Sequence, residues 1–302
     1  MKKYTLLLLI TIIFSCKKEK KDNQKLNIVT TTSMITDLVE NIGDDLINLE
    51  GLMGSGVDPH LYKASEGDVS KLSNADIIFY NGLHLEGKLV EVFEKMQHQN
   101  KKTIALSDAI DKSTLIGSEY FASNYDPHIW FNVDHWIKAG VYVTKVLKEA
   151  LPEHAETIEA NWKTYEEELE NLKIELSVTI EELSLEQRIL VTAHDAFNYF
   201  GKAFDFEVVG LQGLSTATEA GVQDVQKLAT FIIEKKVKAI FVESSVPKRT
   251  IEALQAAVNS KGHQVSIGGT LYSDALGNPD TIEGTYIGMF RYNVNTIVDA
   301  LK

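Results

Sequence analysis

One segment of the chain, residues 153–183, constrains the fold more than any other, because it is predicted to form the longest uninterrupted helix. Its apolar residues recur every three or four positions and glutamate and lysine fill most of the others, so one apolar stripe runs along a polar rod. The stripe covers too few heptads for a coiled-coil seam. We therefore expect this helix to join two separate folded units. The stripe consists of Trp162, Tyr165, Leu169, Leu172, Leu176, Ile180 and Leu183.

The sequence on both sides of this helix alternates between short apolar runs, typical of buried strands, and amphipathic helices. The first such strand begins at Leu26, and the alternation restarts at Ile189. This pattern favours parallel sheets with helices on both faces. The predicted fold class is therefore α/β, with two lobes that are each a mostly parallel sheet flanked by helices. The predicted boundaries are 26–152 for the N-terminal lobe, 153–183 for the rigid linking helix and 184–302 for the C-terminal lobe.

The N-terminus has the pattern of an export signal. Two lysines precede an apolar run from Leu6 to Phe14, which is too short to span a bilayer as a permanent helix. We therefore expect residues 1–15 to be a cleaved signal peptide.

Cys16 is the only cysteine in the 302 residues, and it stands where a signal peptidase would cut. The run Ile13-Phe14-Ser15-Cys16 resembles a bacterial lipobox, which predicts Cys16 as a lipid anchor and residues 16–25 as a polar tether. The alternative is a plain signal peptide with a coincidental cysteine. The prediction is an exported protein, anchored to the cell membrane and facing the periplasm or the exterior.

The overall charge limits the possible partners. The formal net charge of −13 argues against a nucleic-acid partner and weakly favours cationic ligands. A single cysteine cannot form a disulfide within the chain. We expect a monomer.

The tripeptide Asp-Pro-His occurs twice, at 58–60 and 126–128, in a chain with only five prolines. Proline fixes its own φ and biases the preceding residue toward an extended conformation, so each histidine leaves a stiffened loop in a defined direction. A metal ligand needs such a fixed orientation, and an ordinary core histidine does not. The repeat predicts that His60 and His128 are two ligands of one site.

Two further candidates follow predicted strands of the C-terminal half. His194 ends an apolar run that begins at Ile189, and Asp274 follows the strand that ends near Ile267. Ligands of open α/β sheets bind beyond the carboxyl ends of the strands. Among the eight histidines, His84 and His135 are weaker candidates. The surroundings of His98 and His154 indicate solvated side chains, and His263 follows a glycine in a turn and carries no sign of a site.

Several motifs follow one another along the chain after the signal peptide: 54–62 (GSGVDPHLY) with Asp68, 126–130 (DPHIW), 192–200 (TAHDAFNYF), 240–245 (IFVESS), 272–277 (YSDALG), Tyr286 and Asn293-Val294. Together they resemble one known family, the zinc/manganese solute-binding lipoproteins of bacterial ABC importers. The resemblance covers essentially the whole chain after the signal peptide, in order.

The resemblance implies one metal site in the cleft between the lobes, with His60 and His128 from the first lobe and His194 and Asp274 from the second. It also implies an ABC-type permease as partner. Asp58, Asp126 and Glu243 become candidates for hydrogen bonds that hold the ligands. Two features of zinc-dedicated members are missing, a histidine-rich loop before the second ligand and a disulfide in the second lobe.

Three imidazoles and a carboxylate suit Zn²⁺, whereas a bidentate Asp274 would suit Mn²⁺ better, and iron(II) is a further candidate. The leading interpretation is a protein without enzymatic activity that binds a divalent metal with high affinity and delivers it for uptake. The alternatives are a metal-binding surface adhesin and a metallohydrolase. The sequence contains no His-Glu-x-x-His motif, which disfavours the hydrolase.

Overall fold

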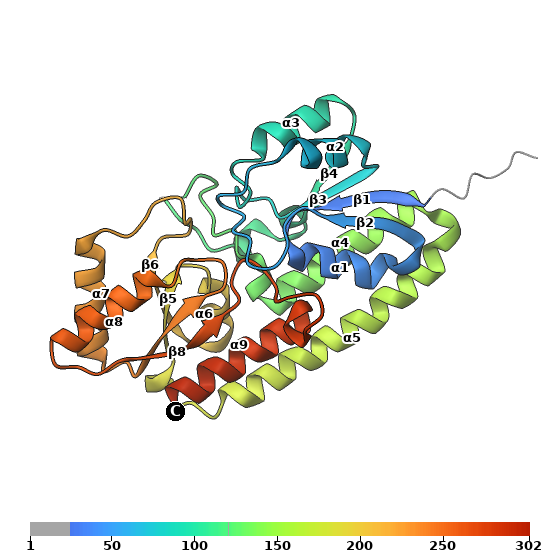
Figure 1. Ribbon diagram of the computed structural model, residues 1–302. Coiled ribbons are helices and arrows are strands. Elements are labelled where there is room, and N and C mark those ends of the chain that lie inside the picture. The colour runs from blue at the N-terminus through green and yellow to red at the C-terminus, as the bar shows by residue number, and fades with distance from the viewer. Residues whose placement is uncertain (1–24, 120) are drawn as a thin grey trace, which may run out of the picture.

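The computed structural model describes residues 25–119 and 121–302 and has two α/β lobes lying on a common layer of long helices (Figure 1). The predicted fold class is confirmed. Cys16, the predicted signal peptide and the tether up to residue 24 lie outside the described residues.

The N-terminal lobe is built on a four-stranded parallel sheet with the strand order β2-β1-β3-β4. The side chains on one face pack with α2 and α3, and those on the other face pack with α1 and α4. Its elements are β1 (Leu26–Thr30), α1 (Ser33–Gly43), β2 (Ile47–Gly51), α2 (Glu66–Asn74), β3 (Ile77–Tyr80), α3 (Val90–His98), β4 (Lys102–Ala105) and α4 (Val133–Ala150).

The described strands of the C-terminal lobe form two parallel pairs, β5-β6 and β7-β8, and β5 lies beside β7. Helices α7 and α8 cover one face with an apolar cluster of their own, and α9 packs against β8. The elements are β5 (Ile189–His194), α6 (Asn198–Phe204), β6 (Glu207–Gln212), α7 (Val222–Lys235), β7 (Ala239–Glu243), α8 (Arg249–Ser260), β8 (Ser266–Leu271) and α9 (Tyr286–Leu301).

The long helix α5 (Ala155–Ile180) runs beneath both lobes, with α9 beside it (Figure 1). All seven residues of the predicted stripe are buried, so the periodicity identified the packed face correctly. The helix is shorter than expected at both ends. A 3₁₀ turn at Pro152–His154 precedes it, because proline lacks the amide hydrogen that a helix interior requires. The last helix, α9, begins at Tyr286, where the Thr285 side chain caps it.

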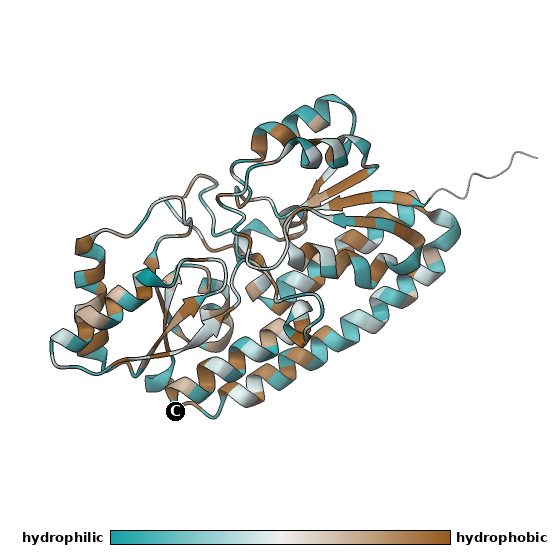
Figure 2. Cartoon of the chain, viewed as in Figure 1, coloured by the Kyte–Doolittle hydropathy of each residue, from teal (hydrophilic) through white to brown (hydrophobic). Residues whose placement is uncertain are grey.

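One large apolar cluster includes residues from both lobes and from the helices beneath them. Figure 2 shows hydrophobic colour on the strands of the N-terminal sheet and alternating colours along α5, as expected for a helix with one buried face. None of the described helices is both long enough and apolar enough to cross a membrane.

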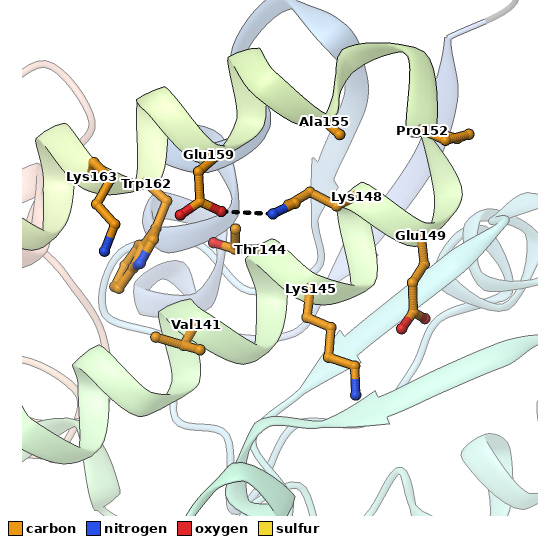
Figure 3. A pocket seen from close by; sticks show the side chains of 10 residues that line it. All are labelled: Val141, Thr144, Lys145, Lys148, Glu149, Pro152, Ala155, Glu159, Trp162 and Lys163. Carbon is orange, nitrogen blue, oxygen red and sulfur yellow. Dashed lines mark hydrogen bonds and ion pairs between the residues drawn. The ribbon is translucent and has the colours of Figure 1, made fainter.

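The contact between α4 and α5 depends on Gly140. A methyl group at this position would come within 2.1 Å of the Trp162 ring, so only glycine lets the indole pack against the backbone of α4. The Lys148 Nζ–Glu159 Oε2 ion pair, at 2.8 Å, bridges the same helices beside a hollow of about 460 Å³ (Figure 3). This hollow is lined by none of the predicted ligands.

Candidate metal centre

The structure brings together the four residues that the sequence singled out. His60, His128, His194 and Asp274 are all buried, and each offers one ligand atom that lies within 4.8 Å of the other three. Two come from the N-terminal lobe and two from the C-terminal lobe. The group therefore exists only when the lobes are assembled.

The two Asp-Pro-His loops share one local device. In each, Oδ1 of the aspartate accepts a hydrogen bond from the backbone N–H of the histidine, at 2.8 Å for Asp58 and 2.9 Å for Asp126. This turn orients the histidine from within its own loop.

The two aspartates differ in their other contacts. Asp126 Oδ1 also lies 2.7 Å from Nδ1 of His128, which leaves Nε2 of that ring facing the group. Asp58 has no such ring contact, and its Oδ2 accepts a hydrogen bond from Thr216 Oγ1 at 2.5 Å. Asp58 therefore contacts His60 through the backbone alone, and Asp126 contacts His128 through both backbone and ring.

His194 is the last residue of β5 and Glu243 the last residue of β7, so the adjacency of these strands places them together. Glu243 Oε1 accepts the backbone N–H of His194 at 2.8 Å, and Oε2 lies 2.5 Å from Nδ1 of its ring. Such a carboxylate fixes the orientation of the His194 ring and directs its Nε2 toward the position of a bound cation.

Asp274 lies in the loop after β8, with its carboxylate facing all three rings. The distances from its nearest oxygen to the Nε2 atoms are 4.0 Å for His60, 3.6 Å for His128 and 3.2 Å for His194. The three Nε2 atoms and both carboxylate oxygens are buried without a hydrogen-bond partner. Buried polar atoms are rarely left unpaired, so five that converge on one point indicate a site for a cation.

The pKa values of the group reflect burial and mutual charge. Burial lowers the pKa of His60 to about 3, so this ring is neutral at physiological pH. Burial alone would also lower the pKa of His194, but Asp274 and Glu243 raise it well above its ordinary value. Burial raises the pKa of Asp274, yet the histidines outweigh it and hold this pKa well below its usual range.

The other histidines lie elsewhere. His84 is exposed, although it shares a small cavity of about 110 Å³ with His60. His135 is buried beside Thr114, whose Oγ1 lies 3.1 Å from its Nε2. Neither belongs to the four-residue group.

Sequence reasoning missed two polar contacts that support the group. Asn198 Nδ2 donates to Asp126 Oδ2 at 3.0 Å, and Thr216 contacts Asp58 as described above. Each of these two contacts joins one lobe to the other, between residues that are far apart in the sequence. The only available signal was that Asn198 belongs to the motif that follows His194.

The fold and this group define a metal-binding protein in which two α/β lobes on a rigid helical layer enclose three imidazoles and one carboxylate. Residues 28–300 match the model of a family described as zinc-uptake complex component A, periplasmic (ZnuA). The chain belongs to this family.

Individual relatives resemble the chain over nearly its full length. The manganese-binding lipoprotein MntA of Bacillus subtilis is 48% identical, with 94% of this chain and 92% of that protein covered. The zinc-binding protein TroA of Treponema pallidum is 46% identical, with 96% and 93% covered. A solved structure of that periplasmic zinc-binding protein aligns with a TM-score of 0.89 at 47% identity, covering 92% of this chain and 99% of the other.

Proposed function

We propose that this protein binds one divalent transition metal ion, zinc or manganese, outside the cytoplasmic membrane and delivers it to an ABC-type permease for uptake. The observation that carries the proposal is the convergence of five buried, unpartnered donor atoms from two lobes. Membership of a metal-uptake family supports the same conclusion.

In this proposal His60, His128 and His194 bind the ion through Nε2, and Asp274 binds it through its carboxylate. Asp126 and Glu243 hold two of the rings, and Asp58 holds the His60 loop. The ion is cargo and not a catalyst, because a catalytic metal keeps an open position for water or substrate, whereas all four ligands here are buried. The protein is proposed to have no enzymatic activity.

The donor set is compatible with either metal. Three imidazoles and one carboxylate satisfy tetrahedral Zn²⁺, whose intrinsic affinity exceeds that of Mn²⁺. A bidentate Asp274 would raise the number of donors to five, two of them oxygens, and favour Mn²⁺ or iron(II). Relatives of similar identity are named for manganese and for zinc, which supports both assignments equally.

The remaining parts of the proposal concern the location. Cys16 would carry the lipid that holds a monomeric protein on the membrane, and residues 16–25 would let the lobes reach the permease. Names of relatives that include "lipoprotein" and "ABC transporter substrate-binding" support this arrangement. Release would require the lobes to move apart, because each contributes two ligands.

The test is elemental analysis of protein purified without added metal, followed by competition titration with Zn²⁺ and Mn²⁺. We expect one ion per chain. A variant with alanine at His60 and His194 should contain none, whereas His135→Ala should retain it. Equal metal content in wild type and double variant would refute the proposed site.

A further inference from the structure

Three of the four proposed ligands, His128, His194 and Asp274, lie beside the large apolar cluster that both lobes share. Each is followed within two residues by a buried member of that cluster. These members are Ile129 after His128, Ala196 after His194 and Leu276 after Asp274. Burial of apolar side chains from both lobes in one cluster opposes their separation. These three ligands are therefore attached to the part of the molecule that joins the lobes.

His60 is held in a different part of the molecule. Val57 and Tyr62, which lie on either side of it in the sequence, pack against a separate apolar cluster formed by the N-terminal sheet with α2 and α3. All the described members of this cluster belong to the N-terminal lobe. If the lobes separate, the His60 loop therefore moves with the N-terminal lobe.

Hydrogen bonds across the lobe boundary divide the ligands in the same way. The segment 126–130, which contains His128, makes four bonds with the C-terminal lobe, although it precedes α4 of the N-terminal lobe. These bonds run from Asn198 Nδ2 to Asp126 Oδ2 at 3.0 Å, from Tyr199 Oη to the Asp126 carbonyl at 3.0 Å, from Tyr286 Oη to the Trp130 carbonyl at 2.7 Å and from Trp130 Nε1 to the Ser273 carbonyl at 3.0 Å. From its own lobe, Asn81 Nδ2 donates to the Pro127 carbonyl at 2.9 Å.

The loop that carries His60, residues 54–62, makes one hydrogen bond with the C-terminal lobe, counted over the part of the chain that the structure describes. In this bond Thr216 Oγ1 donates to Asp58 Oδ2 at 2.5 Å. Thr216 is buried and lies in the loop between β6 and α7. Asp58 in turn accepts the backbone N–H of His60 at 2.8 Å. A single hydrogen bond therefore connects the His60 loop to the opposite lobe.

A small cavity lies beside His60 at the lobe boundary. Its volume is about 110 Å³, and of the four proposed ligands His60 alone lines it. Phe121 lines it from the N-terminal lobe, and Ser215 and Ala217, the two neighbours of Thr216, line it from the C-terminal lobe. A water molecule needs roughly 10–15 Å³ of such volume, so the cavity has room for water next to the His60 ring.

We propose that His128, His194 and Asp274 form a three-ligand metal site that stays assembled when the lobes loosen, and that His60 is the ligand that binds last and leaves first. Release begins when the bond between the metal and His60 Nε2 breaks and a water from the cavity takes that position. Zinc with three protein ligands and one water is a stable arrangement, so the ion stays bound at this stage. The inference rests on the proposed metal-binding function.

The repeated Asp-Pro-His tripeptide supplies a matched comparison within one molecule. The amides of His60 and His128 both follow proline and both donate to the aspartate two residues earlier, at 2.8 Å and 2.9 Å, so their intrinsic exchange rates are nearly equal. In the metal-free protein, hydrogen exchange measured by NMR should be at least about tenfold faster at His60, because the His128 segment must break more hydrogen bonds to open. Equal protection of the two amides would overturn the inference.

The rate of Zn²⁺ release into excess chelator provides a second readout. Thr216→Val removes the one bond that connects the His60 loop to the other lobe, and should speed release roughly 3- to 10-fold. The matched control is Thr218→Val, at an exposed threonine of the same loop, which should release Zn²⁺ like wild type. Tyr199→Phe removes one of the four bonds of the His128 segment and should speed release less than Thr216→Val. A release rate of Thr216→Val equal to that of Thr218→Val, or below that of Tyr199→Phe, would contradict the inference.

Imidazole added to two alanine variants provides a third readout. His60→Ala should bind one Zn²⁺ per chain more weakly than wild type and regain affinity when imidazole is added, because the cavity beside residue 60 admits it. His128→Ala should not regain affinity, because residue 128 is fully buried beside the shared cluster. An equal response of both variants would refute the division of three ligands from one.

Thermal melting of the metal-free variants shows whether each one folds, and the exchange comparison uses the wild-type chain and does not depend on them. Failure of the proposed function would be distinguishable, because wild type would then bind no Zn²⁺, whereas the exchange rates of the two amides would still differ.

Discussion

Replacing Asp274 by asparagine should weaken metal binding more than any other single change that preserves side-chain volume. The carboxylate is buried, both of its oxygens lack hydrogen-bond partners, and it lies 3.2–4.0 Å from the Nε2 atoms of three histidines. It is the only anionic member of the group, so the variant would leave a dication among neutral imidazoles and an amide.

The size of the effect follows from the burial of the charge. Removing one partner of a buried charge pair costs about 3–5 kcal/mol. Each ~1.4 kcal/mol is a tenfold change in affinity, so the dissociation constant should rise roughly 10²- to 10³-fold. Mn²⁺ should lose more than Zn²⁺, because manganese depends more on oxygen donors.

The assay is competition titration with both metals, with Asp280→Asn as the matched control. Asp280 is an exposed aspartate farther along the same loop, so its replacement makes the same chemical change outside the group. His84→Ala adds a test of the exposed histidine that shares a cavity with His60. If Asp274→Asn binds both metals as tightly as Asp280→Asn does, Asp274 is not a ligand and the arrangement of two ligands per lobe is wrong.

Three further outcomes are expected. Glu243→Gln should lower metal affinity roughly 10- to 100-fold in the same titration. The amide NH₂ would face Nδ1–H of His194 and favour the tautomer protonated on Nε2, which cannot bind a metal through that atom. An unchanged affinity would contradict this role of Glu243. Zn²⁺ binding at pH 7.5 should release about one proton, because the raised pKa of His194 keeps this ring protonated in the metal-free protein and the proton must leave first. Zn²⁺ affinity should then rise about tenfold per pH unit up to the pKa of His194. A released proton is taken up by the buffer, so a binding heat that does not depend on the buffer's ionisation enthalpy would argue against this proton release. Cys16→Ser should leave metal affinity unchanged and move the protein from the membrane to the soluble fraction, and retention in detergent-free membranes would disprove the lipid anchor.

The sequence by itself determined the local features of this protein. Helical periodicity identified the buried stripe of α5 from Trp162 to Ile180, because the 3.6-residue repeat of a helix requires no knowledge of its partners. Alternation of strand and helix patterns indicated parallel sheets. The two prolines of the Asp-Pro-His loops marked His60 and His128, since proline restricts the backbone wherever the loop lies. The boundaries between lobes and linking helix stay a prediction.

Only the tertiary structure decided which side chains meet. The contact between His194 and Glu243 depends on β5 lying beside β7, and Thr216 reaches Asp58 only because the lobes close on each other. The clearest case is Asp37, which reads in the sequence as one polar residue on an amphipathic helix. Its carboxylate accepts a hydrogen bond from Tyr165 of α5, 128 residues farther along the chain, and no local pattern encodes such a distant neighbour.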